Sequence, residues 1–120
     1  MAGSKPWRPV AIGVSTGLAY KPATAASTEE VIGICQSVKA YGGLYCTHMR
    51  DEGDAAMDSL EETFRIGREV GVSVLISHHK VVGVSDYGRS TETLKFIAAN
   101  MSNQPICLDF YPYVARHQLL

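Results

Sequence analysis

The amino-acid sequence predicts an α/β fold with a parallel sheet built in the order βαβαβαβ. Four short apolar runs rich in β-branched residues alternate with three stretches that have the apolar spacing of helices. The starts of these runs lie roughly 30 residues apart, which is the size of one βα unit. Two architectures share this alternation: about half of a (β/α)8 barrel, or a small doubly wound three-layer sheet.

The predicted strands span residues 10–14, 44–47, 73–77 and 105–109. The last three alternate little between apolar and polar residues, as strands that are buried on both faces do. Consecutive strands joined by helices form parallel sheets with right-handed crossovers. We therefore expect the carboxyl ends of these strands to meet at one edge of the sheet.

The predicted helices span about residues 28–41, 54–70 and 91–101. Ser27 and Glu30 have the spacing of a capping box at the start of the first helix. Gly71 is placed to end the second helix in the left-handed conformation. Ser90 is placed to act as the N-cap of the third helix.

The composition predicts a single globular domain over residues 1–120. Hydrophobic residues make up 46% of the chain and charged residues 19%, so the chain can bury a core. The net charge of −1 argues against nucleic acid as a partner, because phosphate binding requires a surplus of basic residues. We expect no membrane span and no secretory signal. The three widely spaced cysteines form no disulfide framework, which favours a cytoplasmic location.

Polar residues gather where the second, third and fourth predicted strands end. His48 follows the second strand, His78 follows the third, and Asp109 ends the fourth. Ligands of parallel α/β folds bind at this edge of the sheet. Two consecutive strands that each lead into a histidine indicate a candidate metal site; the alternative is that both residues are ordinary polar residues of the rim.

Side-chain alternation along the strands refines this prediction. His48 shares a face of its strand with Cys46, and His78 shares a face with Ile76. If both faces point the same way, the two imidazoles meet where they can share a zinc ion. His79 has the opposite parity and is expected to point away.

Lys80 returns to the same side as His78 and is placed to offer a charge to a substrate carboxylate. The acidic residues after His48 are expected mostly on helix surfaces, and those near the helix start complement the helix dipole. This set comprises Asp51, Glu52, Asp54, Glu61, Glu62 and Glu69.

Four motifs occur in the order that they have in the D-aminoacylases, the N-acyl-D-amino-acid deacylases of the amidohydrolase superfamily. They are STGLAY at 15–20 with the following PA, GGLYCTHMRDE at 42–52, ISHHK at 76–80 and DFYPY at 109–113. The chain resembles this family over about residues 10–115, which is nearly its whole length.

The resemblance implies an internal fragment of an amidohydrolase barrel and a zinc-dependent reaction that hydrolyses the amide of N-acyl-D-amino acids. By resemblance, His48 and His78 are metal ligands, Lys80 holds the substrate α-carboxylate, and Tyr20 lines the same pocket. The family's His-x-His pair and its last-strand aspartate have no counterpart in this sequence, so no catalytic residue is assigned. We therefore expect weak zinc binding and no turnover by this chain alone.

The alternative is a non-catalytic α/β module, or a half-barrel that self-associates. A half-barrel leaves two edge strands with unpaired backbone groups and one open sheet face. We expect Val74 and Ile76 on that open face, and homo-oligomers in place of a stable monomer.

Overall fold

The computed structural model describes residues 11–113, and in this range strands and helices alternate as the sequence predicts. No helix in the described range is long and apolar enough to cross a membrane. The elements are β1 (Gly13–Gly17), the short 3-10 helix η1 (Ala23–Ala25), α1 (Thr28–Lys39), β2 (Leu44–His48), α2 (Ala56–Val70), β3 (Ser73–Ile76), α3 (Ser90–Met101) and β4 (Ile106–Leu108).

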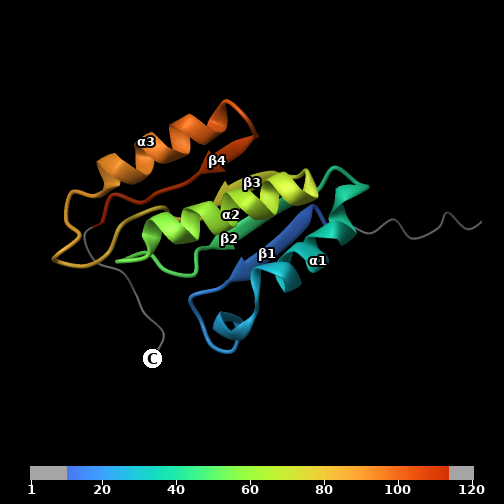
Figure 1. The fold of residues 1–120 in the computed structure, drawn as a ribbon, viewed down its shortest axis with the longest axis horizontal. Helices are drawn as coiled ribbons and strands as arrows, with labels where there is room; N and C mark the ends of the chain where they lie inside the picture. Colours follow the sequence, from blue (N-terminus) through green and yellow to red (C-terminus); the bar gives the residue numbers. More distant parts are fainter. Residues whose placement is uncertain (1–10, 114–120) are drawn as a thin grey trace, which may run out of the picture.

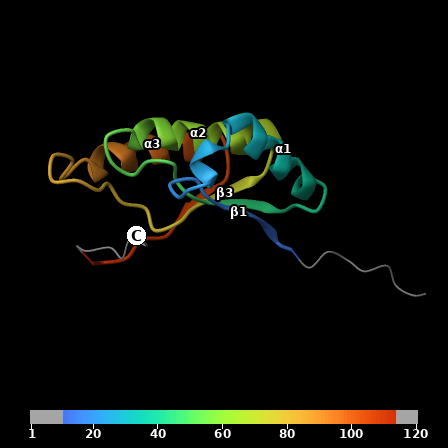
Figure 2. The same cartoon turned by 90° about the horizontal axis from the view of Figure 1, so that it is seen from below.

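The strands form one parallel sheet in the order β1-β2-β3-β4, so each new strand joins the same growing edge (Figure 1). Helices α1, α2 and α3 all lie on one side of this sheet (Figure 2). Right-handed crossovers that always advance in one direction place every helix on the same face. The α/β class is confirmed, and the arrangement is that of an arc of a βα barrel. The doubly wound alternative is wrong, because it requires helices on both faces.

The first strand begins later than the apolar run suggests. Val10 lies outside the described residues, and β1 extends to Gly17, which pairs with His48. A Cβ atom at Gly13 would lie 2.2 Å from the carbonyl oxygen of Leu44. Pairing with β2, and not the apolar content of residues 10–14, therefore sets the position of this strand.

The helix ends confirm two of the three predicted signals. Ser27 accepts a hydrogen bond from the Glu30 amide, and the Glu30 carboxylate accepts one from the Ser27 amide, which completes the capping box. Gly71 ends α2 with a φ of 79°. Ser90 is the first residue of α3 and not its N-cap, because the chain already turns helically at Arg89.

The core lies between the sheet and the helices. Tyr45, Val74 and Ile76 point to the helix side and are almost completely buried, so the expectation that Val74 and Ile76 lie on the open face is wrong. The cross-strand row on the opposite face is Ser15, Cys46, Leu75 and Cys107. In this row Ser15 and Cys107 are exposed, and the other two are half-buried.

Candidate metal centre

Two histidine side chains meet at the carboxyl edge of the sheet. His48 is the last residue of β2, and His78 lies just after β3. The Nδ1 atom of His48 is 2.8 Å from the Nε2 atom of His78, and the ring centroids are 4.4 Å apart. The structure therefore brings together the two residues that the sequence pairs.

The pairing arises by a different route from the predicted one. Ile76 faces the helices, whereas His48 lies on the opposite side of the sheet, so strict alternation would send His78 toward the helices. The φ of His78 is +39°, in the left-handed region that few residues other than glycine adopt. This one residue reverses the alternation and carries the His78 side chain to His48.

The same reversal sends His79 to the helix side. His79 is buried, and its Nε2 atom lies 2.9 Å from the Thr93 hydroxyl on α3. Burial lowers the pKa of the His79 imidazole, and the Glu52 charge offsets this only in part. The end of β4 supports the turn, because the Asp109 carboxylate accepts a hydrogen bond from the His78 amide and its carbonyl accepts one from the His79 amide.

Glu52 is the residue that sequence reasoning missed. It is only 4% exposed, although it was expected on a helix surface. Its Oε1 atom lies 3.3 Å from His78 Nδ1 and 3.6 Å from His48 Nε2, and its Oε2 atom lies 2.8 Å from Lys80 Nζ. The loop after β2 folds back against the loop after β3, where the Val82 amide donates to the Glu52 carbonyl. The only signal in the sequence is the four-residue spacing from His48.

Lys80 and Tyr20 complete the group around the histidines. The Lys80 ammonium contacts the Glu52 carboxylate, the His78 Nδ1 atom at 2.9 Å and the His78 carbonyl at 3.1 Å. The Tyr20 ring, from the loop after β1, lies 4.7 Å from the His48 ring. The four site residues that the sequence predicts thus lie together. We call these four residues and Glu52 the histidine cluster: Tyr20, His48, Glu52, His78 and Lys80.

Tyr111, just beyond β4, also lies beside this cluster. The Lys80 ammonium is 5.3 Å from the centre of the Tyr111 ring. A largely apolar cleft of about 550 Å³ opens next to these two residues, and Leu94 and Phe110 form part of its wall. Tyr111 belongs to a motif that follows a strand end, but nothing in its spacing singles it out.

The histidine cluster has the chemistry of a transition-metal site. One ligand atom from each of His48, Glu52 and His78 lies within 4.8 Å of the others. Imidazole nitrogen with carboxylate oxygen is a donor set that zinc accepts. The two facing nitrogens also share one small space, so a cation can replace the contact between them.

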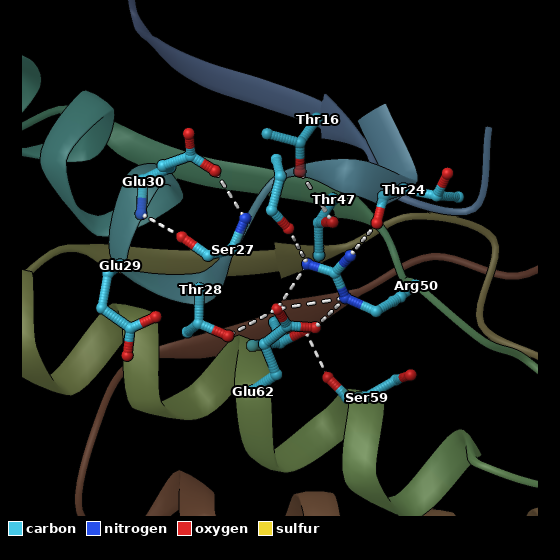
Figure 3. Close-up of polar contacts among 12 residues, drawn as sticks. Thr16, Thr24, Ser27, Thr28, Glu29, Glu30, Thr47, Arg50, Ser59 and Glu62 are labelled. Carbon is cyan, nitrogen blue, oxygen red and sulfur yellow. Dashed lines mark hydrogen bonds and ion pairs between the residues drawn. The ribbon is translucent and has the colours of Figure 1, made fainter. Parts of the chain in front are cut away.

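A second polar cluster lies on the helix side of the sheet (Figure 3). Arg50 donates to both carboxylate oxygens of Glu62 on α2, and also to the carbonyls of Thr24 and Ala26. Glu62 accepts a further hydrogen bond from the Thr28 hydroxyl. We call this group the Arg50 cluster; it joins the loop before α1, the start of α1 and the middle of α2.

Comparison with known proteins gives relatives over nearly the whole chain. A D-aminoacylase of Alcaligenes xylosoxydans xylosoxydans is 57% identical over 110 residues, which are 92% of this chain and 23% of that protein. An N-acyl-D-aspartate deacylase of the same organism is 46% identical over 111 residues, which are 92% of this chain and 22% of that protein. Over these residues the chain is similar to a segment of the D-aminoacylases. It spans less than a quarter of the length of these D-aminoacylase relatives, and no family model matches it.

Solved D-aminoacylase structures have the same local fold. One, described as defining a novel subset of amidohydrolases, is 58% identical with a TM-score of 0.84, over 86% of this chain and 22% of that one. Another, reported for its binuclear metal centre, is 57% identical with the same TM-score and the same coverage of both chains. An N-acyl-D-glutamate deacylase of Bordetella bronchiseptica, in complex with zinc and a phosphonate mimic of the tetrahedral intermediate, is 37% identical. Its TM-score is 0.78, over 85% of this chain and 22% of that one.

Proposed function

We propose that this chain forms the metal-binding and carboxylate-binding part of an enzyme that hydrolyses the amide bond of N-acyl-D-amino acids. The observation that carries the proposal is the contact between the facing nitrogens of His48 and His78, with the Lys80 ammonium beside them. The named activities of the relatives support the same substrate class. We propose that this chain shares the substrate class, the metal and the reaction of these relatives.

In this proposal His48 and His78 would hold a zinc ion. Such an ion would polarise the substrate carbonyl and lower the pKa of a bound water molecule. The protein contributes the orientation of the rings. His48 is fixed at a strand end and His78 by the Asp109 contacts, so little motion is needed to form the site.

Lys80 and Tyr20 bind the amino-acid part of the substrate. The Lys80 side chain is about one-fifth exposed, and its Nζ atom lies beside His78. An ammonium there attracts the α-carboxylate as a point charge. Tyr20 is 42% exposed and its ring lies beside that of His48, whereas Lys80 contacts His78.

Two carboxylates in contact with the histidines already have partners of their own. Glu52 contacts Lys80, and Asp109 accepts a hydrogen bond from the His78 amide. A base contributes about 10²–10⁴ to the rate of such reactions. We therefore propose that the 120-residue chain binds zinc but does not itself turn over N-acyl-D-amino acids.

Zinc titration by calorimetry tests the metal part of the proposal. We expect His48→Ala and His78→Ala each to weaken zinc binding on the order of 100-fold, because a catalytic zinc site needs its protein ligands. His79→Asn is the matched control, since this histidine bonds Thr93 and faces away from the site. Equal affinity in all four proteins contradicts the assignment.

Amine release from N-acetyl-D-methionine tests the catalytic part. The chain is incubated with zinc, and the His48→Ala/His78→Ala double variant serves as the blank. We expect no difference between the two proteins. Zinc-dependent turnover above the blank shows that the chain supplies its own base.

A further inference from the structure

The Glu52 carboxylate lies behind the two histidines and not between them. The nitrogens that face each other are Nδ1 of His48 and Nε2 of His78. The nitrogens beside Glu52 are the other two, Nε2 of His48 at 3.6 Å and Nδ1 of His78 at 3.3 Å. One carboxylate oxygen thus lies near the rear nitrogens of both rings.

A metal at the facing nitrogens fixes where the ring protons must be. A neutral imidazole that gives one nitrogen to a metal carries its proton on the other nitrogen. These protons then lie on His48 Nε2 and His78 Nδ1, the two atoms that Glu52 Oε1 approaches. Metal-ligating histidines commonly donate this second N–H to a carboxylate, which sets the tautomer and the ring orientation.

The second oxygen of Glu52 has a separate partner. Its Oε2 atom lies 2.8 Å from Lys80 Nζ, and the Glu52 side chain is only 2% exposed. The ammonium also lies 2.9 Å from His78 Nδ1, a contact that becomes repulsive once that nitrogen carries a proton. Glu52 and the His78 carbonyl are then the acceptors that hold Lys80 in place.

We propose that Glu52 is a positioning residue that orients both metal-binding histidines with one carboxylate oxygen and the substrate-binding Lys80 with the other. This inference rests on the proposed function, because it assumes a metal between His48 and His78. The two histidines and the Lys80 ammonium then share one buried carboxylate. Disturbing Glu52 should therefore affect both sites together.

The Glu52→Gln variant of the full chain tests the proposal by zinc calorimetry. An amide can present its oxygen to the rings or to Lys80, but not to both, because its other end is a donor. We expect zinc affinity to fall about 10–100-fold, the range for loss of such a supporting carboxylate. The matched control is Glu62→Gln, which removes a comparable buried carboxylate from the Arg50 cluster. We expect this control to bind zinc like the parent chain.

Long-range ¹H–¹⁵N spectra of the histidine rings give a readout that a purely structural role would not move. In the zinc-loaded parent chain, we expect metal-bound Nδ1 for His48 and metal-bound Nε2 for His78. The protons should lie on the two nitrogens beside Glu52. This measurement needs no substitution, so it decides the question even if Glu52→Gln does not fold.

The outcomes separate this inference from the proposed function. A parent chain that binds no zinc overturns the proposed metal site and the inference with it. A parent chain that binds zinc, with unchanged affinity in Glu52→Gln, overturns the inference alone. Metal-bound His48 Nε2 and His78 Nδ1 also overturn it, because Glu52 is then a ligand of the ion.

Discussion

Glu52 and Glu62 are both largely buried carboxylates beside a cation, but their surroundings differ in kind. Glu62 binds the guanidinium of Arg50 through both oxygens and the hydroxyl of Thr28. Arg50 also donates to the backbone carbonyls of Thr24 and Ala26. Every partner in this group has a fixed donor or acceptor role, because the guanidinium stays charged and its fork geometry is rigid.

Glu52 is surrounded by groups that can change their bonding. Two imidazoles can exchange protons for a metal, and an ammonium on a flexible stem can turn toward a substrate. Both clusters contain a buried charge, so burial alone does not distinguish the proposed metal site from the Arg50 cluster. The partners of the buried carboxylate distinguish them.

The histidine cluster and the Arg50 cluster face different sides of the sheet. The largest expected effect is self-association of the chain through the side without helices. Half-buried Leu75 and exposed Cys107 lie on that side. Exposed apolar sheet faces and unpaired edge strands favour association. Under reducing conditions at high micromolar concentration, sedimentation velocity should show dimers or larger species.

Leu75→Lys should shift this distribution toward monomer, because it places a charge on the open face. Ala99→Lys, on the exposed side of α3, is the control and should leave the distribution unchanged. A single monomeric species in the parent chain would count against the prediction.

The sequence was sufficient for the order of elements, for the caps at Ser27 and Gly71, and for the meeting of His48 with His78. The sequence did not predict how the two side chains come together, because side-chain alternation cannot reveal a left-handed backbone conformation such as that of His78. Glu52 was missed for a related reason. Its burial depends on the contact between two loops, and neither loop shows that contact in its own sequence.

Breaking the Arg50 cluster should have the largest effect on stability. Arg50→Met leaves the Glu62 carboxylate without its main partner, and two backbone carbonyls without donors. We expect a loss of about 2–3 kcal/mol in the free energy of unfolding, below the value for a fully buried pair. Urea unfolding measures this loss, and Arg65→Met, which removes two exposed ion pairs, should leave the midpoint nearly unchanged. An Arg50→Met midpoint equal to that of the parent would show that the cluster is not structural.

The Arg50 cluster also predicts how the free energy of unfolding depends on pH. Burial alone would raise the pKa of Glu62, but the hydrogen bonds from Arg50 and Thr28 and the Arg50 charge hold this pKa below its ordinary value of 4.5. A carboxyl with a lowered pKa stabilises the fold above its unfolded pKa, and this contribution is lost as the pH falls through the folded pKa. When urea unfolding is measured between pH 7 and pH 3, the free energy of unfolding should therefore fall less with decreasing pH in Glu62→Gln than in the parent chain. Parallel curves would contradict the prediction.

The smallest expected effect is a difference in stability between substitutions at Ser27 and Ser90, the two serines that the sequence places at helix starts. Ser27 accepts from the Glu30 amide, next to the Ala26 carbonyl that Arg50 binds, whereas Ser90 makes no side-chain cap at α3. Ser27→Ala should lower the free energy of unfolding by about 1 kcal/mol, and Ser90→Ala should lower it by much less. Urea midpoints compare the two variants, and zinc affinity should be unchanged in both because neither serine contacts the histidine cluster. Equal losses would mean that Ser90 caps α3 after all, and a loss of zinc affinity in Ser27→Ala would mean that the two clusters are coupled through the loop that Arg50 holds.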